Sequence, residues 1–403
     1  MSNRVRFLLI TSSCIVVFYI VLGGLLGKND SSSEKTYRNL GVYSEVLSRI
    51  KNEYVTEPDL KRVTGGAIRG LLEALDPYST YFTPQEYQEY LRQPDPGPAH
   101  VGIFIAKRLG FATVISVLPG SPAEKAGVKA GDLIDRVDSS ATRELSVVQI
   151  QRLLAGPAGS TVTLTLVREA RGDPQKYPIT RAPLVYPPVV SKALEESAGY
   201  IRVATFDKGK ATEISGRLKE LIAGGADKIV LDLRNCAGGE PEEAVDTASL
   251  FLEKGLVAYL SGQRYPRHDL AAKHVGELCK LPVAVLINQS TAGPAELVAS
   301  AIQGNKRGEV IGIRSFGVGV FQKVITLDDG SALLLSVAKY YGPDGKAIQD
   351  NGVTPSVIES SADRAAGADD DSEPDEPEQF GGKDDQQLRK AIEILSQKSA
   401  KAA

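Results

Sequence analysis

From Tyr200 to about residue 320, short apolar segments alternate with longer amphipathic ones. GYIRVATF, KIVLDLR and VAVLIN have the length and β-branched content of buried strands, and TEISGRLKELIAGG and EEAVDTASLFLEKG lie between them with helical spacing. A further helix begins at Pro294, and VIGI follows it as another strand. Strands that alternate with helices favour an α/β core with a mainly parallel sheet, which is the fold class we predict.

Two regions of different pattern precede this core. The first is helical from Tyr37 to Gln93 and ends at the Pro/Gly-rich stretch QPDPGPAH. The second is a compact strand-rich unit that ends near Arg181. We therefore expect six parts: an anchor or signal (1–34), a helical domain (35–97), a strand-rich domain (98–184), the core (185–358), an acidic linker (359–383) and a C-terminal helix (384–403).

The C-terminal helix places Leu388, Ile392 and Leu395 on one face. This pattern predicts that the helix packs back on the body of the protein. An amphipathic helix that binds a partner is the alternative.

The N-terminus carries an uncharged, mostly apolar stretch from Phe7 to Gly27, preceded by Arg4 and Arg6. Its length suits a membrane span of about 20 residues, and no small-x-small cleavage site follows it. We predict an uncleaved anchor in the cytoplasmic membrane; a cleaved signal peptide is the alternative. Because the positive flank lies on the N-terminal side, the body should be exported to the periplasm or the outer face of a bacterium.

The charge distribution argues against nucleic-acid binding. The net charge is -3, but residues 363–378 hold eight acidic residues and one Arg, so the remainder of the chain carries -3 + 7 = +4. That excess is small and no Lys/Arg run accompanies it. The acidic stretch itself is typical of a solvated linker.

Three cysteines do not form a disulfide framework, and we predict no bridge between Cys236 and Cys279.

Seven motifs then occur in a fixed order along the chain: NEYV, GLLEALDPYSTYFTPQEY, GSPAEKAGVKAGDLI, GYIRVATF, LDLRNCAGG, RSFGVGVFQ and DGSALLLSVAKYYGPDGKAIQDNGVTPSV. With them the chain resembles the carboxy-terminal processing peptidases, also called tail-specific proteases. The resemblance covers about Tyr37 to Ile358 and the last helix. It implies a helical cap, an inserted PDZ domain (98–184) and a crotonase-like (ClpP/crotonase type) α/β core.

The resemblance also implies a mechanism without a cofactor or metal. In the family a serine attacks the scissile carbonyl and a buried lysine, neutral because it is desolvated, acts as general base. Two backbone N–H groups hold the oxyanion. One comes from the Gly-Gly loop after the LDLRN strand and the other from the residue that follows the serine.

This sequence departs from that pattern at three positions. The serine position matches Gly293 and the lysine position matches Val318, with the family's separation of 318 - 293 = 25 residues. The residue after the nucleophile position is Pro294, which has no backbone N–H. Loss of that oxyanion donor alone removes about 3–4 kcal/mol of transition-state stabilisation.

Other parts of the implied site remain. Gln322 matches the glutamine that orients the lysine, and since it lies four residues after Val318 we expect both on one face of a strand. Gly238 and Gly239 keep the loop of the other oxyanion donor. Glu296 keeps an acidic residue in the first turn of the helix, where it complements the dipole.

Several residues are candidates for a displaced active site, each with a structural alternative. Ser290 and Thr291 flank the vacant position, although hydroxyls before a helix usually cap it. Cys236 adjoins a loop rich in backbone donors, although a buried filler is the commoner role. Lys323 lies five residues after Val318, so we expect it on the opposite face of the strand. We expect the other candidates on the surface, as Lys306 and Arg314, or in loops, as His100, His268 and His274.

The predicted PDZ domain keeps its peptide-binding features. The motif AHVGIF stands where the family places its carboxylate-binding loop, so the backbone N–H groups of His100, Val101, Gly102 and Ile103 are expected to face a peptide C-terminus. The peptide would add as a strand beside GIFIA. Apolar residues of the following helix could receive its last side chain or belong to the core: Val148, Ile150, Leu153 and Leu154.

Nucleophile, base and one oxyanion donor are absent together, so the sequence predicts an exported pseudoprotease. Its partners would be protein or peptide C-termini, further copies of itself or an active homologous protease, and the membrane through its N-terminal segment, but no nucleic acid. An active serine-type peptidase with a displaced nucleophile is the alternative. Acyl-CoA chemistry on a crotonase-like core would rest on fold analogy alone.

Overall fold

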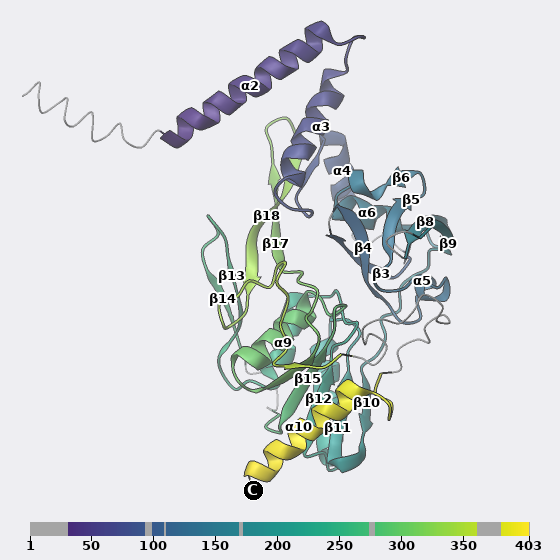
Figure 1. Cartoon of the computed structure of the whole chain (residues 1–403), viewed down its shortest axis with the longest axis vertical. Coiled ribbons are helices and arrows are strands. Elements are labelled where there is room, and N and C mark those ends of the chain that lie inside the picture. The colour runs from purple at the N-terminus through teal and green to yellow at the C-terminus, as the bar shows by residue number, and fades with distance from the viewer. Residues whose placement is uncertain are drawn as a thin grey trace, which may run out of the picture. The chain divides into compact units, whose positions relative to one another are not determined.

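The structure is a computed structural model that describes residues 31–92, 99–108, 110–168, 172–273, 279–360 and 380–402 (Figure 1). The predicted anchor at residues 7–27, most of the acidic linker and His274 lie outside these ranges. Within them, no helix is both long and apolar enough to cross a bilayer.

The chain divides into two compact units, residues 1–68 and residues 69–403. The described part of the first unit holds α2 (Ser31–Glu53) and the beginning of α3 (Leu60–Glu73), which crosses the boundary between the units. Leu40, Val42 and Val55 are exposed in this unit. The helices α2 and α3 confirm the helical pattern predicted from Tyr37, and α2 begins six residues earlier, at Ser31.

The second unit begins with the end of α3, a short strand β1 (Thr80–Phe82) and α4 (Pro84–Arg92). The sequence pattern did not predict β1. It joins a five-stranded sheet whose other members lie far along the chain, in the order β1-β18-β13-β14 with β17 beside β18. Those members are β13 (Leu256–Ser261), β14 (His268–Ala271), β17 (Val320–Thr326) and β18 (Ala332–Tyr341).

The strand-rich unit forms a sheet in the order β3-β4-β5-β8-β9, with β6 beside β5. Its alternate apolar residues pack with α6 (Val147–Leu154), whose first turn is closed by a reciprocal Ser146–Gln149 capping box. Strand β3 stands at the end of the order, so among the described strands one of its edges has no partner in this sheet. The other elements are β2 (Ala99–His100), β3 (Ile103–Arg108), β4 (Phe111–Val117), α5 (Pro122–Lys125), β5 (Leu133–Val137), β6 (Ser140–Ala141), η2 (Thr142–Glu144), β7 (Ala155–Gly156), β8 (Thr161–Val167) and β9 (Gln175–Thr180).

The core contains a six-stranded sheet in the order β10-β11-β12-β15-β16-β19. All neighbours from β11 to β19 are parallel and only β10 is antiparallel, which confirms the predicted α/β class. The strands are β10 (Val190–Ala193), β11 (Ala198–Arg202), β12 (Lys228–Asp232), β15 (Val283–Ile287), β16 (Gly308–Gly312) and β19 (Val357–Ile358). A short 3-10 helix, η3 (Glu195–Ser197), links β10 to β11.

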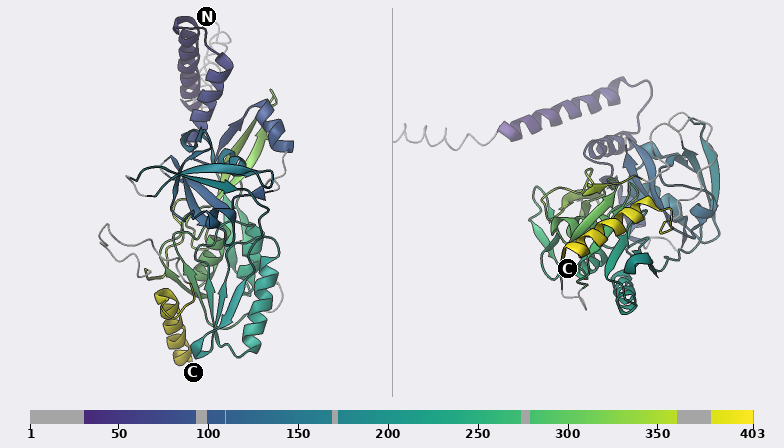
Figure 2. Two further views of the ribbon diagram at one scale, coloured as in Figure 1. Left: turned by 90° about the vertical axis from the view of Figure 1, so that its right-hand side faces the viewer. Right: turned by 60° about the horizontal axis from the view of Figure 1, so that its bottom comes forward.

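Helices cover both faces of this sheet. Alternate strand residues such as Ile229 and Leu231 pack with α7 (Lys210–Ala223), α8 (Pro241–Ser249) and α9 (Pro294–Gly304). The intervening residue Val230 packs with α10 (Gln386–Ala402), which lies along the opposite face (Figure 2). Leu388 and Leu395 are buried there with Ile392 beside them, as the amphipathic pattern predicted.

A buried ionic network fastens the C-terminal helix. The Arg234 guanidinium donates to Asp232 at 2.6 Å and to Asp385 at 2.6 Å, and it also donates to Gln387 at 3.0 Å. The Tyr200 hydroxyl donates to Asp232 at 2.7 Å. These bonds tie the helix to the strand end that leads into the site described next.

Candidate functional site

Three loops at the carboxyl ends of neighbouring parallel strands meet at one place, which is where open α/β sheets bind their ligands. They follow β12, β15 and β16. Asn235 and Asn288 are bonded reciprocally, since Asn235 N donates to Asn288 Oδ1 at 3.0 Å and Asn288 Nδ2 donates to Asn235 Oδ1 at 2.7 Å. Ala292 N donates to Cys236 O, and Phe316 N donates to Thr291 O, both at 2.9 Å. The sequence-predicted site segments are therefore brought together.

The turn after β15 has a backbone that only glycine adopts easily. Gly293 has φ 62° and ψ -121°, and it directly precedes the helix α9, which begins with Pro294. A strained strand-to-helix turn of this kind presents the nucleophile in hydrolases that have an elbow. A Cβ added to Gly293 would meet no atom within 4 Å, so the turn has room for a side chain that the sequence does not supply.

The Glu296 carboxylate joins this turn to the loop that follows β16. It is completely buried and accepts from Gly293 N, Gly317 N and Val318 N at 2.8 Å each, and from Ser315 Oγ at 2.5 Å. Burial raises the pKa of Glu296 to about 7, although the four donors oppose that shift. Sequence reasoning assigned Glu296 only to the helix dipole and missed this bridging role, because three of its four partners lie about twenty residues further along the chain.

The geometry around Val318 differs from the expectation. Strand β17 begins only at Val320, and its register shifts between Phe321 and Gln322. The prediction that Val318 and Gln322 share a strand face was therefore wrong, since a bulge interrupts the alternation on which it relied. Gln322 Nε2 instead donates to Tyr78 O at 2.9 Å.

The predicted oxyanion loop is covered by the neighbouring domain. Gly238 and Gly239 have φ of 75° and 103°, and a Cβ on Gly238 would lie 2.1 Å from Cε1 of Phe104. Ser116 Oγ donates to Asn235 O at 2.6 Å. Val318 packs in the same apolar cluster as Phe104 and the buried residues Ala106, Ile115, Ala237 and Ala292. Strands β3 and β4 thus lie against both the Gly-Gly loop and the Val318 position.

The alternative nucleophiles are buried. Ser290 and Thr291 are 4% and 0% exposed, and Thr291 Oγ1 accepts from Asn288 N and donates to Leu233 O. Neither hydroxyl caps α9, contrary to their expected structural role, because the N-cap is Gly293. Cys236 is also fully buried, which raises the pKa of its thiol.

The charged candidates divide between the surface and backbone contacts. Lys323 and His268 are exposed, and His268 stands on β14 rather than in a loop. Arg314 donates to Asp350 O at 3.1 Å and also to Asn351 O. Lys306 ends the turn after α9 with φ 55°. Within the described residues, none of these four side chains forms a hydrogen bond or ion pair with the turn at Gly293.

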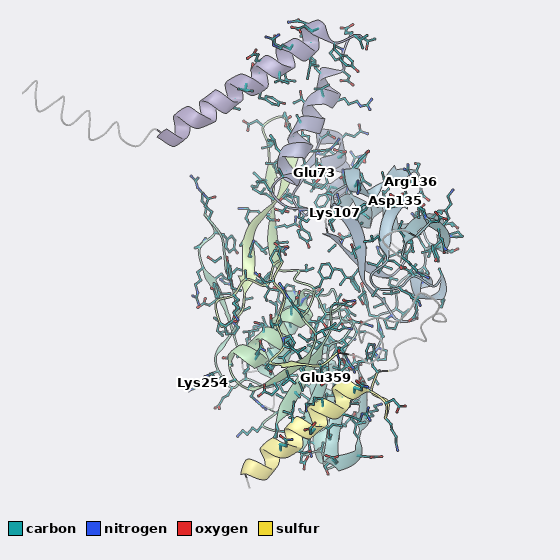
Figure 3. The ribbon with its side chains drawn as sticks, viewed as in Figure 1. Glu73, Lys107, Asp135, Arg136, Lys254 and Glu359 are labelled. Carbon is teal, nitrogen blue, oxygen red and sulfur yellow. The ribbon has the colours of Figure 1, made fainter. Side chains whose placement is uncertain are left out.

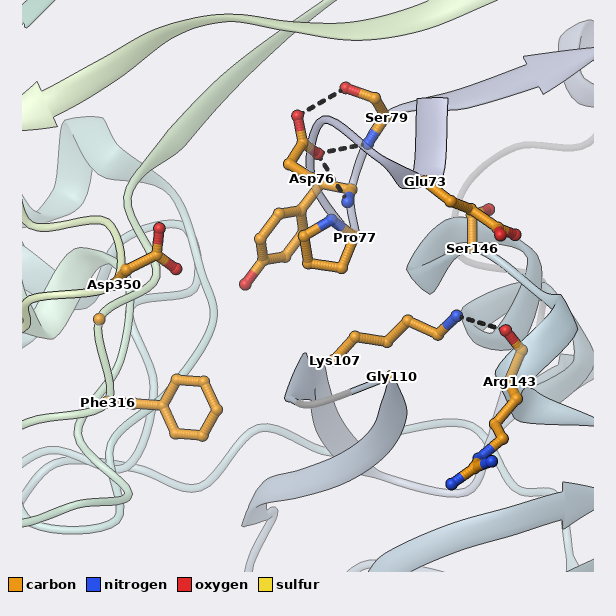
Figure 4. A pocket seen from close by; sticks show the side chains of 12 residues that line it. Glu73, Asp76, Pro77, Ser79, Lys107, Gly110, Arg143, Ser146, Phe316 and Asp350 are labelled. Atoms are coloured by element: carbon orange, nitrogen blue, oxygen red, sulfur yellow. Dashed lines mark hydrogen bonds between the residues drawn. The ribbon is translucent and has the colours of Figure 1, made fainter. Parts of the chain in front are cut away.

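A cavity of about 520 Å³ opens beside Phe316 and Gly317 (Figure 4). Lys107 from β3 projects into it, and its Nζ donates to Arg143 O at 3.0 Å. Burial lowers the pKa of Lys107, and the nearby Glu73 carboxylate opposes this shift (Figure 3). Sequence reasoning missed the cavity, because its walls come from five separate segments of the chain, between Glu73 and Asp350.

The predicted carboxylate loop is partly engaged within the protein. His100 lies on β2, with its N bonded to Ala182 O at 3.0 Å, and Gly102 N donates to His100 Nδ1 at 3.0 Å. Two of the four expected donors are therefore occupied in this structure. In the helix α6, Ile150 and Leu154 are completely buried in the domain core, which leaves Val148 and Leu153 as partly exposed candidates for the groove.

Known proteins are similar to this chain in sequence and in fold. Residues 197–358 match peptidase family S41, and residues 113–168 match the PDZ domain. A carboxy-terminal-processing protease of Bartonella bacilliformis is 31% identical over 334 residues, which cover 81% of this chain and 76% of that protein. A carboxyl-terminal-processing protease of Picosynechococcus is 32% identical over 344 residues, covering 83% and 79%.

The chain belongs to peptidase family S41. Among solved structures, the photosystem II D1 C-terminal processing protease has a TM-score of 0.67 at 29% identity and covers 79% of this chain and 86% of its own. The S41 fold and the PDZ domain expected from the motifs are thereby confirmed. Homology to serine-type C-terminal processing proteases is equally clear, so the question that remains is what a member with Gly293 and Val318 does.

Proposed function

We propose that this S41 member is a proteolytically inactive protein that binds the C-termini of other proteins. The observation that carries the proposal is the combination of Gly293, Pro294 and Val318 on an otherwise ordered frame. The backbone turn, the Gly-Gly loop and the Glu296 bridge are in place, whereas the groups that would perform acyl transfer are not.

The energetic argument for inactivity is strong. A serine-type reaction needs a nucleophile and a base within hydrogen-bond reach, and glycine and valine supply neither. Loss of one member of such a pair already removes most of the rate, and further losses are not additive. Pro294 removes a backbone donor in addition, which by itself accounts for about 3–4 kcal/mol.

The named relatives are proteases, and this favours the rival proposal of an active enzyme with a displaced nucleophile. The environment of the nearest hydroxyls argues against it. Thr291 Oγ1 donates its hydrogen bond to Leu233 O, and the side chain of Ser290 is only 4% exposed. A nucleophile must reach a substrate carbonyl, and a buried hydroxyl bonded to a backbone oxygen does not.

The binding role rests on the PDZ domain. PDZ domains take up an extended peptide beside a free sheet edge, and β3 offers such an edge within its sheet. We further propose that the apolar segment at residues 7–27 tethers the body to the cytoplasmic membrane on its exported side. Partners of the right chemistry would be exported proteins with apolar C-termini, an active homologous protease, or further copies of this chain.

The proposal is tested by incubating the soluble body, residues 35–403, with casein and with peptides that end in an apolar residue. We expect binding of the peptides without cleavage of either substrate. Turnover that disappears in Ser290→Ala or Thr291→Ala would establish the rival enzyme and end the proposal of inactivity.

A restoration experiment shows whether only the three reactive groups are missing or whether the rest of the active site has also changed. The triple variant Gly293→Ser, Pro294→Ala, Val318→Lys supplies nucleophile, second oxyanion donor and base, and the turn has open space for the serine. We expect detectable casein cleavage from this variant. A folded but inert variant would mean that further features block the site, of which the cover of Gly238 by Phe104 is the first to remove.

A further inference from the structure

The His100 side chain closes the loop in which it stands. Its Nδ1 accepts a hydrogen bond from Gly102 N at 3.0 Å, two residues further along the chain. The His100 backbone is held independently, because His100 N donates to Ala182 O at 3.0 Å and Ala182 N donates to His100 O at 3.3 Å. The imidazole can therefore rotate away without moving the strand that carries it.

The rest of the loop is fixed by bonds on its carbonyl side. Val101 O accepts from Ala123 N and Gly102 O accepts from Leu118 N, both at 2.9 Å. Gly102 has φ 87°, and a Cβ there would lie 2.3 Å from Cβ of Ser121. The Gly102 N–H thus donates to a side chain and not to a backbone carbonyl, and in this structure its acceptor is the imidazole of His100.

We propose that His100 occupies the place of a peptide carboxylate, so that a C-terminus binds this loop only by displacing the imidazole, more easily as the pH falls. The inference rests on the proposed function that this loop binds peptide C-termini. It adds the residue that regulates the binding and the condition that favours it.

The chemistry of imidazole gives the pH dependence. Nδ1 accepts from Gly102 only when it carries no proton, so the proton of the neutral ring is assigned to Nε2. Burial, helped by the charge of Arg181, lowers the pKa of His100 to about 4. An imidazole turned out into water has a pKa of about 6.5, so displacement takes up a proton between these values. The freed ring is then a cation beside the incoming carboxylate.

Among the residues that the structure describes, the charged group that acts on His100 is Arg181, and its guanidinium is held in place. It donates to Leu153 O at 2.7 Å, to Leu154 O at 3.2 Å and to Ser160 Oγ at 2.9 Å. The paired strand β7, Ala155–Gly156, has no titratable side chain. Acidification from about pH 7.5 to about 5.5 is therefore expected to act on His100 alone in this loop.

The test measures the affinity of the full-length protein for a fluorescein-labelled peptide that ends in Leu-Val, with the C-terminally amidated peptide as control. The natural protein should bind the free carboxylate about tenfold more tightly at pH 5.5 than at pH 7.5. His100→Ala removes the competing acceptor, so it should bind about fivefold more tightly than the natural protein at neutral pH. Its affinity should change little on acidification.

His100→Asn is the matched variant. An asparagine oxygen accepts from the backbone N–H two residues on but does not titrate. This variant should bind as weakly as the natural protein at neutral pH and gain nothing at acidic pH. If His100→Ala binds no more tightly and all three proteins share one pH profile, the proposal is wrong while peptide binding stands.

Hydrogen exchange without peptide decides the remaining case. The Gly102 amide should be protected in the natural protein and in His100→Asn, and it should exchange faster in His100→Ala. If no variant binds peptide but this difference appears, the closed loop is real and the proposed function falls. If the exchange rates are equal, the internal bond does not hold the loop and the inference falls.

Discussion

The turn at Gly293 and the loop at Gly102 are both centred on a glycine, and in the proposals above neither is open to a ligand, for different reasons. Both glycines have positive φ, 62° and 87°. At Gly293 the turn carries no side chain, and the backbone N–H groups of Gly293 and Val318 donate to Glu296. At Gly102 the donor is still present and is masked by the side chain of His100. In the function proposed above, the first loss follows from the sequence itself, whereas the second is reversed when one imidazole rotates.

The largest expected effect concerns Glu296. Glu296→Ala would leave three backbone N–H groups and the Ser315 hydroxyl without their buried acceptor. We expect a loss of about 4 kcal/mol in the free energy of unfolding, because each orphaned donor contributes about 1–3 kcal/mol. Chemical denaturation measures it, with exposed Glu220 replaced by Ala as control. A loss no larger than that of the control would mean that Glu296 does not hold the two loops together.

The pH dependence of stability tests whether the buried Glu296 titrates at a raised pKa. Its pKa is raised by burial to about 7, above the value of about 4.3 in an unfolded chain. Its contribution to stability is therefore complete below about pH 4.3 and falls as the pH rises to about 7, by roughly 3 kcal/mol. The difference between the natural protein and Glu296→Gln should follow this curve. A difference that is constant with pH contradicts it.

The contribution of His100 to stability should change with pH in the opposite direction. Its pKa is lowered to about 4, below the value of about 6.5 in an unfolded chain, so its contribution is present above about pH 6.5 and is lost as the pH falls to about 4. His100→Asn should therefore lose less stability than the natural protein on acidification in denaturant titrations. Parallel losses in the two proteins would show that His100 does not remain neutral in its loop.

The smallest effect tests backbone strain. Gly293→Ala should destabilise the protein by about 2 kcal/mol, because an L-residue is strained at this φ and ψ although its Cβ has open space. Gly216 also has open space but stands in the helix α7 with ordinary φ, so Gly216→Ala should stabilise by about 0.5–1 kcal/mol. Thermal or denaturant unfolding compares them, and equal signs for the two variants would refute the assignment of strain.

The sequence predicted the parts of the fold that depend on local periodicity. Strands alternating with helices gave the parallel sheet, and the spacing of Leu388 and Leu395 gave the docking of α10. The strand β1 was missed, because three residues carry little pattern and their partner Leu334 lies about 250 positions away. In α6, helical spacing marked the apolar residues but could not separate the buried Ile150 from the partly exposed Leu153.

Predictions about the site were wrong where they relied on residue spacing and the backbone did not follow the regular spacing. The bulge at Phe321 and Gln322 broke the two-residue alternation, so a face assigned by parity was wrong. The acceptor for the Gly102 N–H could not be found from backbone pattern, because it is a side chain. Gly293, Pro294 and Val318 were matched to the family's pattern by their places in the motifs, which needs no geometry.

Recovery of a bound peptide decides whether the protein binds C-termini without cleaving them. The protein is saturated with a peptide that has a free apolar C-terminus, the bound fraction is measured, and the peptide is then recovered from the same sample and weighed by mass spectrometry. We predict saturable binding and quantitative recovery of the intact peptide after long incubation. Recovery of shortened peptide, in amounts that rise with time and with protein concentration, would contradict the account.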